Sequence, residues 1–319
     1  MREPTPASTA LADVAPEPGV AKPDPILVVD KVRRSFGGLT AVDVEHLELQ
    51  RGAITSLIGP NGAGKTTFFN LMTGFDEPNT GTWRFAGDDL AGVPAHRVAR
   101  SGMVRTFQLT KALTRLTVLE NMKLGATQQR GERMLTSLWP PAWKAQERAI
   151  EERADELLVR FKMDHMRDEL GGTLSGGQRK LLEMARALMV EPSMVMLDEP
   201  MAGVNPALTQ SLLQHVKDLP SFGMTVLFVE HDMDVVMDIS DWIVVMAQGQ
   251  IIAEGPPDVV SKDAAVITAY IGEEHGDESR FTPVPRGAAA PTAVIEEAPV
   301  DTREGDDEPS GSHAEEREP

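Results

Sequence analysis

The stretch at residues 59–67, GPNGAGKTT, constrains the fold of this chain more than any other feature. It follows the apolar run at residues 53–58 and precedes residues 68–74, which can be helical. Three glycines let the backbone turn tightly with several N–H groups pointing at one anion, and the following helix presents its N-terminus to the same anion. In this pattern Lys65 supplies positive charge for the outer phosphates and Thr66 a ligand for Mg²⁺. We therefore predict a strand, a phosphate-binding loop and a helix, with a nucleoside triphosphate held by Asn61, Gly62, Gly64, Lys65, Thr66 and Thr67.

The composition is typical of a globular protein, since 41% of the 319 residues are hydrophobic and 25% are charged. No run approaches the ~18 to 20 apolar residues needed to cross a bilayer, and the N-terminal residues lack the apolar core of a signal peptide. We therefore predict that the chain neither spans a membrane nor is secreted, so that any membrane role comes through a partner. The absence of cysteine excludes disulfides and thiolate metal sites and is compatible with a reducing cytoplasm.

The net charge of −18 is concentrated at the C-terminal end. Residues 273–319 contain fourteen acidic and four basic side chains, which accounts for −10 of the total. We interpret residues 273–319 as a disordered acidic tail and residues 1–25, rich in Pro, Ala and Glu, as a disordered leader, because neither has enough apolar residues to bury. The acidic balance also argues against nucleic acid as a partner.

Residues 26–272 carry the strand and helix patterns of a folded domain. In its first part, β-branched or alternating runs predict strands at residues 26–29, 32–36, 44–49, 81–85 and 103–107. Antiparallel strands here, beside the buried strand that precedes the phosphate loop, predict a mixed sheet.

A helical lobe is predicted over about residues 109–190. Residues 118–124 and 148–161 carry apolar side chains at three- and four-residue intervals, and residues 139–143 (WPPAW) break the chain between them. The last helix of the lobe begins near Gly177 and stops before Pro192. Its predicted apolar stripe consists of Leu181, Leu182, Ala185, Leu188 and Met189.

A strand–helix alternation resumes after this lobe. The patterns predict strands at residues 194–197, 225–229, 242–246 and 250–253, the last two forming a hairpin that turns at 248–249, and helices at 206–219 and 233–239. Residues 264–271 are expected to close the fold. Strands that are apolar on both faces and separated by helices indicate a parallel sheet covered on both sides.

Two carboxylates end the strand at residues 194–197. Asp198 and Glu199 follow four apolar residues, which places them at the carboxyl edge of a buried strand, where ligands collect in α/β sheets. Asp198 is suited to hold Mg²⁺, directly or through water, and Glu199 to orient an attacking water or accept its proton. Such a pair alone is commonly only a solvated turn, but the phosphate loop gives it a catalytic interpretation.

Two further polar residues follow predicted strands. Gln108 opens the helical lobe, so its amide could reach the metal or the water. His231 comes soon after the strand at residues 225–229 and could donate a hydrogen bond to a γ-phosphate. Taken alone, a glutamine at such a place is usually a polar cap and a lone histidine is usually structural.

The stretch LSGGQ at residues 174–178 predicts a second anion site. A serine and two glycines ahead of a helix offer open N–H groups, a helix dipole and a hydroxyl. The candidate residues are Ser175, Gly176, Gly177 and Gln178, although serine also favours this position as a plain N-cap. Two phosphate sites in a chain with one nucleotide to bind leave open what the second site contacts.

Together these motifs resemble the ATP-binding-cassette (ABC) ATPases, in order and approximate spacing, over about residues 26–272. The resemblance implies an α/β P-loop fold with a mixed sheet, an antiparallel N-terminal β-subdomain and an inserted helical subdomain. It also implies ATP and Mg²⁺ as ligands and a head-to-tail pair of cassettes, in which the LSGGQ serine of one contacts the ATP held by the other. Phe36 would then pack against the adenine base, and Val42 would be part of the nucleotide site.

A narrower resemblance is to the ATP-binding subunits of branched-chain amino acid importers. It is carried by residues 36–42, 70–75, 104–108, 199–206, 229–234 and 267–274. It implies an ATPase at the cytoplasmic face of the membrane, partnered by a second identical or related cassette, by permease subunits and indirectly by a solute-binding protein. Asn205 departs from the aspartate of many cassettes but agrees with the narrower group.

The substrate does not follow from the sequence, because similar subunits serve urea, short amides and other small organic solutes, and separate chains choose the cargo. Two other classes are an ABC ATPase without a transport role and a regulatory subunit without turnover. One copy of each motif and a modest helical lobe argue against the first class. The presence of both Glu199 and His231 argues against the second.

Overall fold

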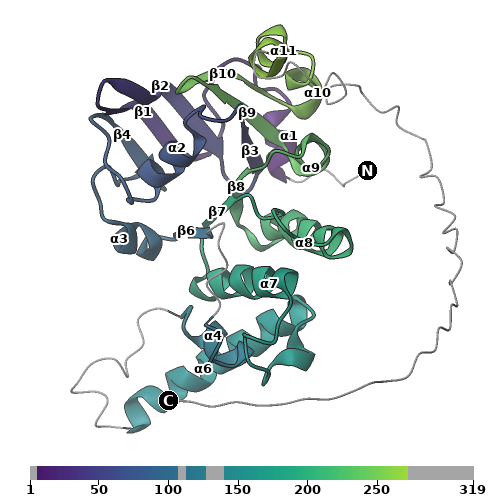
Figure 1. The fold of residues 1–319 in the computed structure, drawn as a ribbon. Coiled ribbons are helices and arrows are strands. Elements are labelled where there is room, and N and C mark those ends of the chain that lie inside the picture. The colour runs from purple at the N-terminus through teal and green to yellow at the C-terminus, as the bar shows by residue number, and fades with distance from the viewer. Residues whose placement is uncertain (1–5, 107–112, 127–139, 272–319) are drawn as a thin grey trace, which may run out of the picture. The chain divides into compact units, whose positions relative to one another are not determined.

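The computed structural model describes residues 6–106, 113–126 and 140–271 (Figure 1). Within these residues the strands are β1 (Pro25–Phe36), β2 (Leu39–Gln50), β3 (Ile54–Ile58), β4 (Thr80–Phe85), β5 (Asp88–Asp89), β6 (Met103–Thr106), β7 (Met194–Asp198), β8 (Thr225–Val229), β9 (Trp242–Ala247) and β10 (Gln250–Gly255). The α-helices are α1 (Pro6–Leu11), α2 (Lys65–Met72), α3 (Ala95–Arg100), α4 (Val118–Lys123), α6 (Pro140–Arg160), α7 (Gly176–Ala187), α8 (Pro206–Asp218), α9 (Met233–Ile239), α10 (Pro257–Val260) and α11 (Ala264–Ile271). Short 3₁₀ helices are η2 (Asp164–Met166), η3 (Leu188–Val190) and η4 (Leu219–Phe222).

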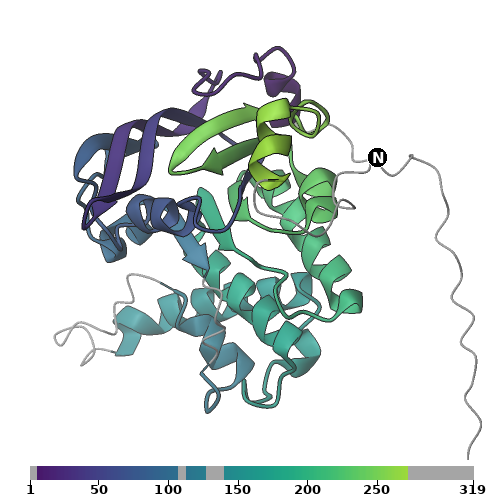
Figure 2. The same cartoon turned by 45° about the horizontal axis from the view of Figure 1, so that its top comes forward.

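The described strands form two sheets. An antiparallel sheet has the order β2-β1-β4-β5, and a six-stranded sheet has the order β10-β9-β3-β8-β7-β6. In the second sheet β10 is antiparallel to β9 and the other neighbours are parallel. The predicted mixed sheet is therefore this one, but its antiparallel member is the C-terminal β10, whereas the N-terminal strands pair among themselves. Figure 2 shows β10 running beside β2, where the two sheets come into contact.

The burial of the strands explains this division. All five residues of β3 and of β8 are buried, as expected for strands covered on both faces. The strands β1 and β2 instead mix buried and exposed positions, because one of their faces meets solvent. The order β3-β8-β7 places the carboxyl ends of these three parallel strands at one edge of the sheet, so the segments that follow them come together there.

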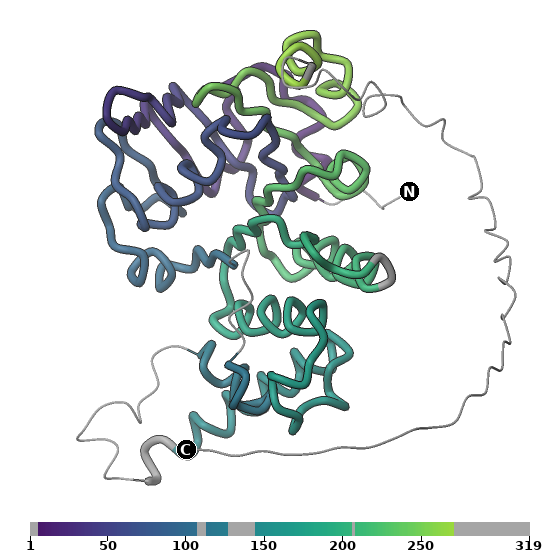
Figure 3. Tube along the Cα trace, viewed as in Figure 1, coloured from purple at the N-terminus to yellow at the C-terminus, as the bar shows by residue number. Residues whose placement is uncertain are grey.

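A helical insertion separates β6 from β7, and Figure 3 traces it along the chain in blue to teal. Helix α4 packs against both α6 and α7. The predicted stripe on the last helix is confirmed, since all five of its apolar residues are buried. Residues 139–143 (WPPAW), predicted to break the chain between the two helices, do not all lie in a break: α6 begins at Pro140, because proline is tolerated in the first turn of a helix.

The prediction of a disordered leader is wrong for residues 6–24. Helix α1 buries Ala7 and Leu11 in the same core cluster as β1 and β2. The following residues close over a buried carboxylate on β10, Glu254, which accepts hydrogen bonds from the backbone N–H groups of Gly19 at 2.6 Å and Val20 at 3.2 Å.

Two side chains complete this network. The carboxylate of Glu254 also accepts from Lys22 Nζ at 2.9 Å and from Trp242 Nε1 at 2.8 Å, and the Lys22 ammonium lies 4.5 Å from the centre of the Trp242 ring. Burial lowers the pKa of Lys22, and Glu254 opposes that shift. Composition concealed this packing, because a buried ion pair between distant residues contributes to the order beside the few buried apolar side chains of α1.

No described helix combines the length and the apolar character needed to cross a bilayer. Gln108 and the predicted acidic tail at residues 273–319 lie outside the described residues.

Candidate functional site

A pocket of about 550 Å³ opens at the carboxyl edge of the six-stranded sheet. It brings together the turn after β3, the residue after β7 and the residues after β8. Its lining residues are Leu39, Thr40, Ala41, Asn61, Gly62, Ala63, Gly64, Lys65, Thr66, Thr67, Glu199, Val229, His231 and Gln248. All six residues predicted for the phosphate loop thus line one pocket with the two predicted catalytic residues Glu199 and His231.

The phosphate loop requires glycine at two points of close approach. Gly59 and Gly64 have φ values of +150° and +104°, and a Cβ at either position would lie within 2.2 Å of a carbonyl oxygen, that of Met246 or of Ala41. Helix α2 begins directly after Gly64, which provides no side-chain cap. An anion at this position can therefore accept from the N–H groups of the first turn.

Lys65 lies over the same loop. Its side chain is 7% exposed, and its ammonium donates to the carbonyl oxygens of Gly59 at 2.5 Å and Pro60 at 2.8 Å. These contacts hold the cation beside the turn, where it can meet the outer phosphates of a nucleotide.

Glu199 and His231 are paired across the pocket from neighbouring strands. Oε1 of Glu199 lies 2.7 Å from Nε2 of His231, a hydrogen bond that fixes the carboxylate. The backbone of Glu199 is left-handed, with φ of +46°, which costs a non-glycine residue free energy and often marks a functional position. The side chain of Glu199 is 23% exposed. Such a carboxylate can orient a water molecule or accept its proton.

The predicted metal ligand Asp198 has a partner that the sequence did not disclose. Oδ2 of Asp198 accepts from Arg105 Nη2 at 2.7 Å, and Nη1 of the same guanidinium donates to Asn70 Oδ1 at 2.6 Å. The two charged side chains are 7% and 13% exposed. Arg105 thereby joins β6 and β7 to the helix of the phosphate loop. In the sequence, Arg105 was marked only as an arginine inside a predicted strand. The metal role of Asp198 stays a prediction.

Other predicted residues lie differently from expectation. Val42 does not line the pocket: its side chain is fully buried in the core, and its neighbours Thr40 and Ala41 line the pocket instead. Phe36 is 48% exposed with the Arg34 guanidinium 4.6 Å from its ring centre, so its contact with a base stays a prediction.

Gln248 is a lining residue that sequence reasoning assigned only to a hairpin turn. That turn packs on the phosphate loop, since Gly249 N donates to Ala63 O at 2.9 Å and Asp43 N donates to Gly249 O at 2.8 Å. The positive φ of Gln248 agrees with the hairpin turn predicted at residues 248–249, but nothing in the sequence placed the turn against the loop.

The LSGGQ residues lie outside this pocket. Ser175 caps helix α7 in a reciprocal arrangement: its Oγ accepts from Gln178 N at 3.3 Å, and Gln178 Oε1 accepts from Ser175 N at 2.8 Å. Ser175 and Gly176 are exposed, whereas Gly177 faces α8, where an added Cβ would lie 2.0 Å from Leu208 Cδ2. Two helix N-termini suited to anions therefore occur in one chain, and the described pocket uses one of them.

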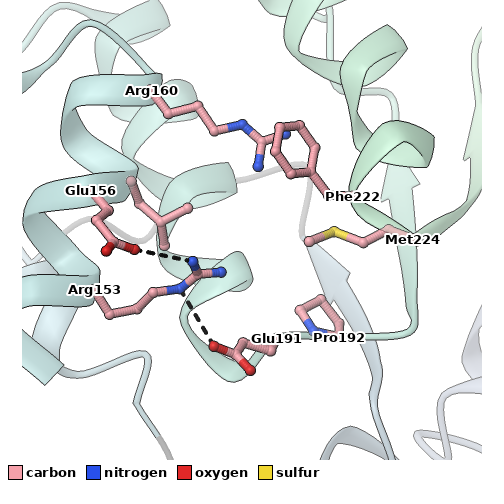
Figure 4. Close-up of a pocket in the computed structure, with 8 residues that line it drawn as sticks. Arg153, Glu156, Arg160, Glu191, Pro192, Phe222 and Met224 are labelled. Atoms are coloured by element: carbon pink, nitrogen blue, oxygen red, sulfur yellow. Dashed lines mark hydrogen bonds and ion pairs between the residues drawn. The ribbon is translucent and has the colours of Figure 1, made fainter. Parts of the chain in front are cut away.

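A second cavity, of about 390 Å³, lies between α6 and the chain segments at Glu191–Pro192 and Phe222–Met224 (Figure 4). Its arginines are already engaged: Arg153 lies 3.5 Å from Glu156 and 3.7 Å from Glu191, and the Arg160 guanidinium stacks on Phe222 at 3.3 Å. It has no glycine-rich loop at a helix N-terminus. The nucleotide-binding geometry therefore belongs to the pocket at the sheet edge.

Two family profiles match the sequence. The ABC transporter family matches residues 42–202, and the C-terminal region described as a branched-chain amino acid ATP-binding cassette transporter matches residues 250–276. Among curated proteins, a probable branched-chain amino acid transport ATP-binding protein, LivG, of Archaeoglobus fulgidus is 40% identical over 252 residues, or 79% of this chain and 97% of that protein. The high-affinity branched-chain amino acid transport ATP-binding protein BraF of Pseudomonas aeruginosa is 41% identical over 251 residues, or 78% of this chain and 98% of that protein.

Solved structures agree with these sequence matches. The ADP conformation of MJ1267, an ATP-binding cassette of an ABC transporter, aligns with a TM-score of 0.68 at 39% identity, covering 78% of this chain and 99% of that one. A nucleotide-free ATP-binding cassette aligns with a TM-score of 0.67 at 38% identity, with the same coverage.

Proposed function

Because the chain belongs to the ATP-binding subunits of ABC transporters, in the branched-chain amino acid group, we propose that it energises an importer of branched-chain amino acids. The family activity is hydrolysis of ATP coupled to transport. The nucleotide is held by Lys65, Thr66 and the loop N–H groups, and the carboxylate that acts on water is Glu199.

One observation carries the proposal for how the subunit works. The pocket contains the phosphate loop, Glu199 and His231 but none of residues 174–178, whose N-cap serine is exposed at the start of α7. A second cassette is therefore needed to bring a serine and a helix N-terminus to the γ-phosphate. We infer a head-to-tail pair in which each ATP lies between the two chains.

In this arrangement the chain's residues divide the work of hydrolysis. Glu199 orients the attacking water and accepts its proton. Nε2 of His231 lies 2.7 Å from this carboxylate, and with nucleotide bound it would donate to the γ-phosphate instead. Lys65 and the first turn of α2 stabilise charge on the phosphates, since catalysis of this kind depends mainly on positioning and electrostatics.

The residues present fit a magnesium ion. Thr66 lines the pocket and Asp198 ends β7, and both side chains carry the hard oxygens that Mg²⁺ prefers, although Oδ2 of Asp198 is paired with Arg105. The described residues contain no cluster of three His, Cys, Asp or Glu side chains that could hold a metal, which suits an ion held largely by phosphates and water. When bound, the ion neutralises charge on the β- and γ-phosphates.

The partners follow from the same proposal. Permease subunits would receive the motion of the helical lobe and hold this chain at the cytoplasmic face of the membrane, and a solute-binding protein would deliver the cargo to them. Closed and open pairs of cassettes would differ in their affinity for ATP and ADP, and this difference is what drives the motion.

Reconstitution with the permease and binding-protein chains of a branched-chain amino acid importer would test the cargo. In proteoliposomes, we expect the ATPase rate to rise when the binding protein carries leucine, isoleucine or valine. Stimulation by urea or a short amide, and not by these amino acids, would contradict the proposed cargo while leaving the ATPase assignment intact.

Dilution tests the pairing itself. The hydrolysis rate per molecule of the isolated subunit should fall as the protein is diluted, because each site needs a second chain. A strictly monomeric sample with a rate per molecule independent of concentration would contradict the shared pocket.

A further inference from the structure

The turn that follows Glu199 is held from one side by Lys180 of helix α7. The Lys180 ammonium donates to three backbone carbonyl oxygens, those of Glu199 at 3.3 Å, Pro200 at 3.1 Å and Ala202 at 2.5 Å. An ammonium group has three donors, so these contacts use its full capacity. The cation therefore fixes the path of the backbone across residues 199–202.

Glu230 holds the same turn from the other side. Its side chain is buried, and its Oε1 accepts from Met201 N at 2.9 Å while its Oε2 accepts from His231 N at 3.3 Å. The carbonyl groups of the turn thus accept from the Lys180 ammonium, and the N–H group of Met201 donates to the Glu230 carboxylate. Burial raises the pKa of Glu230, and the two backbone hydrogen bonds oppose that shift.

The turn needs this support because its first residue is strained. Glu199 has a φ of +46°, and a non-glycine residue stays in that region only where its surroundings impose it. The backbone adds two bonds, from Glu199 N to Val229 O at 3.0 Å and from Ala202 N to Glu199 O at 3.1 Å. Lys180 and Glu230 supply the side-chain contacts that oppose relaxation of the turn.

Lys180 lies among acidic groups at this position. Glu230, Glu183 and Glu199 all raise its pKa, although burial, the larger effect, lowers it. Lys180 also lines a cavity of about 20 Å³ with Asp198 and Pro200, which has room for about one water molecule. Little solvent therefore separates the ammonium from the end of β7.

The position of Lys180 in the sequence gives this contact a further meaning. Lys180 lies two residues after Gln178, on the helix whose N-terminus begins with Ser175 and Gly176. A helix moves as a rigid unit, so a displacement of the α7 N-terminus is carried to the Lys180 ammonium and from there to the Glu199 backbone.

We propose that Lys180 is a positioning residue that couples the LSGGQ helix to the glutamate of the same chain. Engagement of Ser175 by the nucleotide of the partner subunit then sets the orientation of Glu199 in this chain's own pocket. The inference rests on the proposed function, because it needs the pair of cassettes in which α7 faces a second nucleotide.

The variant Lys180→Met tests this role, since it keeps the aliphatic stem and removes the ammonium. In the assembled transporter we expect kcat to fall 10- to 100-fold, with KM for ATP within threefold of wild type, because a small displacement of a catalytic group acts on turnover rather than on binding. Lys180→Arg, which keeps the charge and can reach some of the carbonyls, should give an intermediate kcat. The matched control Lys217→Met removes a lysine that pairs with Asp238 on the surface and should leave kcat within threefold.

A double-mutant cycle separates positioning from a general structural effect. If Lys180 acts through Glu199, Lys180→Met should lower the residual single-turnover rate of a Glu199→Gln protein by less than threefold. The inference would be overturned if the effects of Lys180→Met and Glu199→Gln on the rate multiplied in the double variant. A Lys180→Met transporter with wild-type kcat would also overturn it. A wild-type assembly that fails to hydrolyse ATP, or that hydrolyses it as a monomer, would instead contradict the proposed function.

Discussion

The N-termini of α2 and α7 are both rich in glycine, and they differ in what surrounds them. Helix α2 starts after Gly64 without a side-chain cap, inside a pocket of about 550 Å³ that also contains Lys65. Helix α7 starts at an exposed position and is capped by its own Ser175 and Gln178. The comparison shows that a helix dipole alone does not make a complete anion site. The α2 site has enclosure and a cation, whereas at the α7 site Ser175 and Gln178 cap each other and the anion is proposed to come from another molecule.

The largest expected effect comes from removing the catalytic carboxylate at the α2 site. Glu199→Gln keeps the shape of the side chain but cannot accept a proton, so kcat should fall by about 10²- to 10⁴-fold. ATP binding should persist, because the phosphate loop is intact, and ATP should then hold two chains together with both helix N-termini engaged. ATPase assays and size-exclusion chromatography with ATP measure the two effects.

The control for this variant is Glu156→Gln, which changes an exposed glutamate on α6. It should hydrolyse ATP as the wild type does. Unchanged hydrolysis by Glu199→Gln in the purified complex would remove Glu199 from its assigned role and leave the α2 site as a binding site alone.

The second prediction addresses the α7 site. Ser175→Arg places a long cation where a partner's phosphate must approach, and it removes the cap that orders the first turn. Hydrolysis by the assembled pair should fall at least tenfold, while the affinity of the single chain for ATP, measured with a fluorescent analogue, should change less than threefold. Ser221→Arg, at an exposed position in η4, is the control. Loss of ATP binding in the single chain would mean that Ser175 acts on its own chain's nucleotide.

These two sites also show how far sequence reasoning reaches. The local elements were predicted well, because glycine spacing, apolar strands and apolar stripes are local signals: α9 begins and ends as predicted. The residues missed are those whose role depends on distant contacts. Arg105 joins Asn70 and Asp198, and Gln248 reaches the pocket because its hairpin packs on the phosphate loop.

The prediction of a disordered N-terminal leader was wrong for the same reason. Its composition is that of a disordered segment, yet Lys22 pairs with Glu254, which lies 232 residues away in the sequence. A buried ion pair between residues so far apart leaves no mark in composition or periodicity. Val42 is the opposite error, since the family resemblance placed it at the nucleotide, whereas its side chain is buried in the core as part of β2.

The third prediction compares neighbouring glycines at the α7 N-terminus. A Cβ at Gly177 would lie 2.0 Å from Leu208 Cδ2, whereas a Cβ at Gly176 would meet nothing within 4 Å. Gly177→Ala should therefore be less stable than Gly176→Ala by about 1–3 kcal/mol in urea denaturation, the usual cost of overpacking. Both variants gain the same helix propensity, so the difference reports the contact with α8.

The rescue for this pair is Leu208→Ala, which removes the atoms that the new methyl group would meet. In that background the two glycine variants should have equal stability. A difference that persists would show that Gly177 is required for a reason other than its packing on Leu208.

The smallest expected effect concerns the packing behind α7, where His215 of α8 stacks on Phe161 with 4.5 Å between ring centres. Its Nε2 is buried and has no hydrogen-bond partner within the described residues. Burial lowers the pKa of His215, with Arg160 and Lys162 acting in the same direction and Asp218 opposing them.

As pH falls below about 6.5, the unfolded chain therefore binds a proton that the folded chain does not, so the folded state loses stability until the pH passes below the folded pKa. Urea midpoints measured from about pH 8 to pH 5.5 should fall less steeply for His215→Leu than for the wild type. At pH 8 both proteins carry no charge at this position, so the difference between their urea midpoints there gives the packing change alone. Parallel pH profiles would show that His215 does not contribute to the acid sensitivity of the folded protein.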